Sequence, residues 1–181
     1  MCAVPTPRRL ILLRHAEAAQ PDLGNFSPES DMARPLTHDG EQAAMRCGIW
    51  LRDNNLLPDT VLCSPAIRTR QTLAGIQNVQ PANAQPQVYL CPEIYEAGPS
   101  ALAIAVQQLP EQAHTVLLIG HNPGISEFAR GLDSQNETLD QGFAPGSLAV
   151  FKMRGSDLTP DQSAWADCGS MSLVLHTFTR P

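Results

Sequence analysis

The chain has 181 residues, of which 43% are hydrophobic, 17% charged and only 5% aromatic, and this length favours one domain with a substantial core. With 12 basic and 18 acidic residues, its formal net charge of -6 gives no global reason to bind nucleic acid or an anionic membrane. The longest apolar runs, Leu10 to Leu13 and Val116 to Ile119, are far shorter than the roughly 20 residues of a membrane span, and no signal-peptide core is visible. We therefore expect a single cytoplasmic domain over residues 1–181.

The first half of the chain predicts strands that alternate with helices. The apolar run Arg9 to Leu13 has the length of a buried strand, and Asp39 to Asn55 shows the spacing of an amphipathic helix. A second short strand is expected at Thr60 to Cys63. It leads directly into Ser64, a typical helix cap, and a helix predicted from Pro65 to about Ile76.

The same alternation continues after a proline-interrupted connection. A short strand is expected at Val88 to Leu90, followed by a helix from Pro99 to Leu109. The clearest buried strand runs from Thr115 to Ile119. Asn122 is then expected to cap a helix from Pro123 to about Gly131, which repeats the pattern at Ser64.

The last part of the chain is less regular. Residues 133–146 read as an irregular connection, and Gly155 to Gly169 reads as a polar loop. Strands are expected at Ser147 to Met153 and Leu173 to Phe178. Taken together, the elements predict an α/β fold of three layers, α/β/α, with a largely parallel central sheet.

The cysteine pattern favours free thiols over a disulfide framework or a zinc site. The number is odd, and no two cysteines form a C-x-x-C pair. No acidic cluster for a divalent metal lies near the motifs described below, so we expect neither a metal nor a cofactor. The thiols expected to be reduced and mostly buried are those of Cys2, Cys47, Cys63, Cys91 and Cys168.

Polar side chains follow three of the predicted strands at their carboxyl ends, where α/β sheets bind ligands. They are Arg14 and His15 after the first strand, Ser64 and Arg68 after the second, and His121 and Asn122 after the third. Arginine offers a planar fork that matches phosphate oxygens, and helix starts also favour anions. This set therefore predicts a site for a phosphoryl group or a phosphate ion, held without metal.

Two histidines at such a site suit two different tasks. A neutral imidazole can attack phosphorus and form a phosphohistidine, whereas a protonated one can stabilise the charge of the transferring group. Position alone leaves open which ring does which. Taken singly, Ser64 and Asn122 are equally well explained as helix caps. The other three histidines, His38, His114 and His176, have no neighbours that indicate a function.

Four segments, in this order, resemble the histidine phosphatase superfamily, which has the phosphoglycerate-mutase-like fold. They are R-H-A at 14–16, R-P-L-T-x-x-G at 34–40, S-P-x-x-R-x-x-Q-T at 64–72 and G-H-x-P at 120–123. Residues 145–150 resemble the late strand of the family. Within the superfamily, the chain is most similar to the small SixA-type phosphohistidine phosphatases. The resemblance implies that His15 is the phosphorylated nucleophile and that Arg14, Arg68 and His121 complete the phosphate pocket.

The resemblance also implies a carboxylic acid that protonates the leaving group. Glu93, after the strand expected at Val88 to Leu90, is the first choice, followed by Glu17 and then Glu96. The alternative for Glu93 is that it ends a loop and faces water. An imidazole leaving group needs less protonation than an alkoxide, so a loosely placed acid is compatible with phosphohistidine as substrate.

The short chain leaves little room for an insertion that would enclose a small substrate. Only about twenty residues separate Thr72 from Glu93, so we expect an open pocket suited to a phosphoryl group carried by a protein. The leading hypothesis is a metal-independent phosphatase for phosphohistidine on a partner such as a phosphotransfer domain. The alternatives are a small-molecule phosphomonoester phosphatase or a mutase, which requires a closed site, and a non-catalytic phosphate-binding module.

Overall fold

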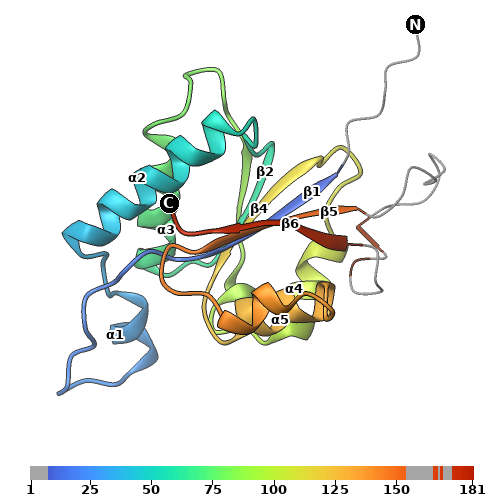
Figure 1. Cartoon of the computed structure of the whole chain (residues 1–181). Helices are drawn as coiled ribbons and strands as arrows, with labels where there is room; N and C mark the ends of the chain where they lie inside the picture. The colour runs from blue at the N-terminus through green and yellow to red at the C-terminus, as the bar shows by residue number, and fades with distance from the viewer. Residues whose placement is uncertain (1–7, 154–164, 167, 169–172) are drawn as a thin grey trace, which may run out of the picture.

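The computed structural model describes residues 8–153, 165, 166, 168 and 173–181. A six-stranded sheet in the order β3-β2-β4-β1-β5-β6 forms the middle layer (Figure 1). Strands β3, β2, β4 and β1 pair in parallel, whereas β5 and β6 are antiparallel to their neighbours. The strands are β1 (Arg9–Arg14), β2 (Thr60–Cys63), β3 (Gln87–Leu90), β4 (Thr115–Gly120), β5 (Leu148–Met153) and β6 (Leu173–Thr179).

Helices cover both faces of this sheet. Helices α2 and α3 lie on one face, and α4 and α5 lie on the other (Figure 1). Their bounds are α2 (His38–Asp53), α3 (Ile67–Gln77), α4 (Pro99–Gln107) and α5 (Gly124–Leu132). The connections contain a short helix α1 (Pro28–Met32) and two 3-10 turns, η1 (Pro92–Ile94) and η2 (Glu137–Gln141). The predicted α/β fold of three layers is therefore confirmed.

The central strands are apolar on both faces because both faces are covered. In β1, Leu10 and Leu12 pack with α4 and α5, while Ile11 and Leu13 pack with α2 and α3. All four side chains are fully buried. This alternation fixes the register of β1, since a shift by one residue would exchange its two faces.

Most predicted elements agree with the structure to within two residues, and three differences matter. Helix α3 begins at Ile67 rather than at Pro65, and Ala66 is its cap residue. Helix α1 was not predicted, and η2 lies in a connection expected to be irregular. Most of the expected loop from Gly155 to Gly169 lies outside the described residues.

Four of the five cysteines lie in the described part of the chain. These four are free and buried, as expected; they are Cys47, Cys63, Cys91 and Cys168. Cys2 lies outside the described residues. None of the helices in the described ranges combines the length and apolar character needed to cross a membrane.

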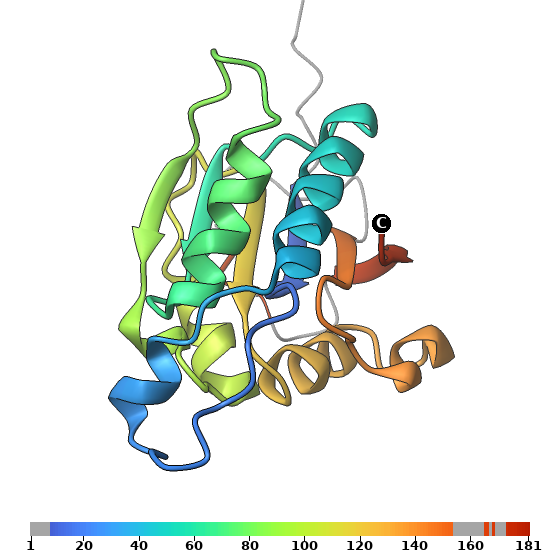
Figure 2. The ribbon, with the colours of Figure 1, turned by 90° about the vertical axis from the view of Figure 1, so that its left-hand side faces the viewer.

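A long excursion of the chain lies between β1 and α2. A β-bridge between Ala18 and Leu36 closes its base, so the residues between them form a loop that carries α1. Figure 2 shows this loop projecting beyond the sheet and its covering helices. The Ser27 hydroxyl accepts a hydrogen bond from the Ser30 amide and so caps α1. The loop forms one wall of the site described next.

Candidate active site

The carboxyl ends of β1, β2 and β4 meet at one edge of the sheet. Strand pairing places Arg14 beside Gly120 and Cys63 beside Ile119, so the residues that follow these strands come together. The His15 amide donates to the Gly120 carbonyl at 3.1 Å. The rings of His15 and His121 lie with their centroids 5.2 Å apart. The structure thus brings both predicted histidines to one place.

A cavity of about 660 Å³ opens at this edge. Seven of the predicted site residues line it, namely Arg14, His15, Glu17, Arg68, Glu96, His121 and Asn122. Ser64 and Glu93 are absent from its lining. Side chains that the prediction did not assign also line it, among them Asp31, Arg34, Tyr95 and, from the loop before α1, Phe26. In the described ranges, no three His, Cys, Asp or Glu side chains gather in a way that could hold a metal ion.

His15 is held as a neutral imidazole. It is 8% exposed, and its Nδ1 lies 2.7 Å from the Ala16 carbonyl oxygen, which can only accept a hydrogen bond. Nδ1 therefore carries the proton, and Nε2 keeps its lone pair. Burial above all lowers the pKa of His15 to about 4; the Ala16 hydrogen bond opposes this shift, and the guanidinium groups of Arg68 and Arg14 add to it. A neutral ring with a free Nε2 has the form that nucleophilic attack requires.

His121 is likewise surrounded by groups that favour the neutral ring. Burial, and after it the nearby Arg68 guanidinium, lower the pKa of His121 to about 3. Arg68 Nη2 donates to its Nδ1 at 3.2 Å, and its Nε2 lies 2.7 Å from the Ser64 hydroxyl. A neutral ring that accepts from Arg68 at Nδ1 donates to Ser64 through Nε2.

Arg68 is the most buried charge of the site, with 1% of its surface exposed. It donates to the backbone carbonyl of Asp31 at 2.6 Å, to the Asp31 carboxylate at 2.9 Å and to Glu96 at 3.2 Å. Its Nε has no partner, and neither has the Nε of Arg14, although both atoms are buried. Both guanidinium groups line the cavity together with His15, and their positive charge favours an anionic ligand.

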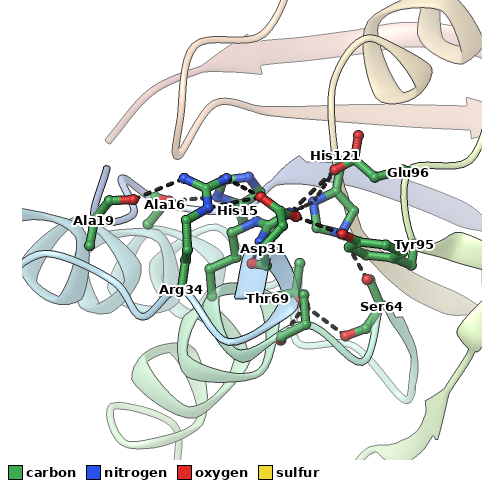
Figure 3. Close-up of polar contacts among 12 residues, drawn as sticks. His15, Ala16, Ala19, Asp31, Arg34, Ser64, Thr69, Tyr95, Glu96 and His121 are labelled. Atoms are coloured by element: carbon green, nitrogen blue, oxygen red, sulfur yellow. Dashed lines mark hydrogen bonds and ion pairs between the residues drawn. The ribbon is translucent and has the colours of Figure 1, made fainter. Parts of the chain in front are cut away.

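The Asp31 carboxylate links three side chains on the wall formed by α1. It accepts from Arg34 at 2.8 Å, from Arg68 at 2.9 Å and from the Tyr95 hydroxyl at 2.6 Å (Figure 3). Partial burial raises the pKa of Asp31, but the hydrogen bonds from Tyr95, Arg68 and Arg34 outweigh it and bring the pKa to about 2. The prediction missed Asp31 and Tyr95. An acidic residue three positions before Arg34 was the only available signal, and such pairs are common on surfaces.

The carboxylate ranked first as proton donor lies elsewhere. Glu93 is exposed and lines a different cavity, together with Tyr89 and Cys91. Glu96, ranked third, reaches the site because its backbone takes a positive φ of 48°, which turns the chain after η1. Its carboxylate lies 3.2 Å from Arg68 Nη2 and 3.5 Å from His121 Nδ1. Of these two carboxylates, Glu96 is therefore the one that the structure places in the cavity with His15.

Neither Ser64 nor Asn122 caps its helix as expected. The Ser64 hydroxyl contacts His121 instead, because α3 begins three residues later. The Asn122 side chain donates to the Phe143 carbonyl and accepts from the Ser126 hydroxyl. Ser64 therefore acts on the site through His121, and Asn122 ties the start of α5 to the segment before β5.

Other residues of the four segments hold the site together. The Ala16 amide donates to the Thr72 hydroxyl, which donates in turn to the Arg68 carbonyl. At Gly40, any Cβ would collide with the Glu17 backbone, and at Gly124 it would collide with the Ala97 carbonyl. Both glycines therefore permit close packing next to the residues that line the cavity.

Comparisons with known proteins point to one family. A sequence model of the histidine phosphatase superfamily (branch 1) matches residues 10–96. An uncharacterized protein of Mycobacterium tuberculosis is 32% identical over 161 residues, which cover 84% of this chain and 95% of the relative. The phosphohistidine phosphatase SixA of Escherichia coli is 29% identical over 117 residues, covering 64% of this chain and 68% of that protein. The solved structure of a candidate phosphohistidine phosphatase SixA from Nakamurella multipartitia has a TM-score of 0.78 and 32% identity, and covers 99% of both chains.

Proposed function

The chain belongs to the histidine phosphatase superfamily and is a phosphatase, and we propose that it removes the phosphoryl group from phosphohistidine on a protein partner. The reaction runs through a covalent phosphohistidine on His15. The observation that carries this proposal is the free Nε2 of a neutral, buried His15 in a cavity that Arg14 and Arg68 also line.

In the first step, His15 Nε2 attacks phosphorus and the bond between phosphorus and the substrate nitrogen breaks. Arg14 and Arg68 line the cavity together with His15, and their guanidinium groups bind the phosphoryl oxygens. His121 acts on the transferring group through Arg68. The Ser64 hydroxyl accepts from His121 Nε2, so Nδ1 accepts from Arg68 and helps to hold the guanidinium group that binds the phosphoryl oxygens.

In the second step, water attacks the phosphoryl group on His15 and releases inorganic phosphate. Glu96 is the group we assign to proton transfer, since its carboxylate lies beside both Arg68 and His121. It accepts the proton of the attacking water. When the leaving group is an alkoxide or phenoxide, the protonated acid first donates to it. Glu17 lines the same cavity and is not needed for either step.

Two observations support a protein substrate. The relatives named phosphohistidine phosphatase SixA in Escherichia coli and Nakamurella multipartitia are similar over much or all of the chain. In addition, the loop at the rim of the cavity exposes two large apolar side chains, with Phe26 at 76% and Leu23 at 84% exposure. Phe26 lines the cavity, whereas Leu23 does not, so only a ligand that extends beyond the cavity covers both.

Rapid quench with a phosphohistidine protein tests this proposal. The purified protein is mixed with a phosphorylated phosphotransfer domain and quenched in base, which preserves phosphohistidine, for intact-mass measurement and peptide mapping. We expect a transient adduct on His15 that decays to inorganic phosphate. His15→Ala abolishes the adduct, and His176→Ala, a change at an exposed histidine on β6, is the matched control.

The other outcomes identify the alternatives. An adduct formed from an aryl phosphate but not from the phosphoprotein would indicate a small-molecule phosphomonoesterase. Absence of any adduct, together with tight binding of phosphate, would indicate a phosphate-binding module. A phosphoprotein dephosphorylated normally by His15→Ala would refute the assignment of the nucleophile.

A further inference from the structure

The cavity carries as many carboxylates as arginines. Arg14, Arg34 and Arg68 line it, and so do Glu17, Asp31 and Glu96. The two histidines add no charge because burial keeps them neutral. A phosphoryl group contributes up to two negative charges, so the loaded cavity is net negative.

No arginine of this set is left for a second anionic group. Arg14 and Arg68 are the arginines assigned to the phosphoryl oxygens. Arg34 is paired with Asp31, since two of its nitrogens contact the Asp31 carboxylate at 2.8 Å and the third donates to the Ala19 carbonyl at 2.9 Å. The part of a substrate beyond its phosphoryl group therefore meets carboxylates without a free cation among the described lining residues.

We propose that Glu17, Asp31 and Glu96 select the charge of the leaving group, admitting cationic or neutral groups and rejecting anionic ones. The inference deepens the proposed function and rests on it for one point, the identity of the cation as a protonated imidazole. Substrates with a second phosphate or a carboxylate, as in the mutase alternative, are disfavoured because they bring like charges together.

The same carboxylates assist the reaction of phosphohistidine. A phosphorylated imidazole that carries a proton on its other nitrogen is a cation, and it leaves as a neutral ring when the bond from nitrogen to phosphorus breaks. Nearby carboxylates favour that protonated form. Proton and charge then balance without an external acid, because the departing ring keeps its own proton and takes the electron pair of the broken bond.

A series of aryl phosphates tests the selection by charge independently of phosphohistidine. The three phenols carry a para two-carbon chain that ends in a carboxylate, a hydroxyl or an ammonium group, and the spacer keeps the reactivity of the phenol nearly constant. We expect kcat/KM to rise in that order. Each step should be up to about fivefold per carboxylate contacted, the range of partly exposed ion pairs. Added salt should compress the differences.

Glu17 is the best position for a variant, because its side chain makes only a long contact, 3.4 Å, with the Thr37 hydroxyl. Glu17→Gln should raise the ratio of kcat/KM for the carboxylate-ended relative to the hydroxyl-ended phosphate by about threefold to fivefold. Glu93→Gln makes the same charge change outside the cavity and should leave that ratio at the wild-type value. The ratio cancels any general loss of activity in either variant.

Binding of the three matching phosphonates gives a second readout that needs no turnover, and their Kd values should follow the same order. The inference would be overturned by equal Kd and kcat/KM values across each series of three compounds. It would also be overturned if Glu17→Gln had the same ratio of kcat/KM for the carboxylate-ended and hydroxyl-ended phosphates as the wild type. Because no compound contains phosphohistidine, the result stands apart from the rapid-quench experiment. A correct charge order with no dephosphorylation of a phosphoprotein would support the selection and refute the proposed substrate.

Discussion

Burial of the neutral His15 ring predicts that the protein loses stability as the pH falls below 6.5. Its pKa is lowered from 6.5 to about 4 in the folded chain, chiefly by burial. The unfolded chain therefore binds a proton near pH 6.5, whereas the folded chain resists it until about pH 4. The stabilising contribution is complete above pH 6.5, falls as the pH drops, and stops changing below about 4.

The size of the effect follows from these two pKa values. At pH 4.5 the unfolded chain is almost fully protonated at this position and the folded chain only in part, which amounts to about 2 to 3 kcal/mol lost relative to pH 7. His15→Gln removes the titrating ring. The fall in unfolding free energy between pH 7 and 4.5 should therefore be smaller in this variant by about that amount, whatever its stability at pH 7.

Urea denaturation of the wild type and of His15→Gln at pH 7 and pH 4.5, in buffers without phosphate, measures the fall in unfolding free energy for each protein. The slope of unfolding free energy against urea must stay constant, so that the change reports stability and not the compactness of the unfolded chain. His114→Gln is the control, since His114 is exposed. If His15→Gln lost as much stability as the wild type over this range, His15 would not be held neutral as its surroundings indicate.

Three further predictions concern the chemistry. Ser64→Ala removes the hydroxyl that holds the second imidazole and should slow phosphoenzyme formation about tenfold in a stopped-flow burst, an effect that normal rates in the variant would exclude. Arg68→Ala should weaken binding of phosphate about a hundredfold in calorimetry, and Arg70→Ala, at an exposed position on the same helix, should not. Glu96→Gln should slow phosphoenzyme formation from phenyl phosphate about a hundredfold or more. Equal slowing by Glu93→Gln would instead identify Glu93, which lies outside the cavity, as the proton donor.

The part of the site that the sequence predicts is the part built on strand ends. Arg14, His15 and His121 follow buried parallel strands whose pairing leaves few alternatives, so their convergence follows from the order of the strands. The prediction that Ser64 caps the helix after β2 was wrong for a related reason. Its position at the end of β2 places it next to the residue that follows β4, and a partner across the sheet replaces the partner along the chain.

The part of the site built on loops could not be predicted. Asp31 lies on a helix of five residues without buried positions, which leaves no hydrophobic period in the sequence. Glu96 depends on a positive φ that residues other than glycine adopt rarely, and the three-residue turn before it directs Glu93 away from the cavity. Both positions are set by contacts with Arg68, a residue distant in sequence.

This division between strand ends and loops also separates two properties of the enzyme. Arg14 and His15 come from the end of β1, and Arg68 from the helix after β2, so the groups assigned to the phosphoryl group rest on the sheet and its nearest helix. Asp31 and Glu96, which we propose select the leaving group, come from α1 and the turn after η1. Glu17 lines the same cavity but takes part in neither step of the reaction, so substitutions there can change which leaving group is accepted while the chemistry at phosphorus stays the same. A phosphatase of this fold with a cation free in the α1 loop should accept the anionic leaving groups that this one rejects.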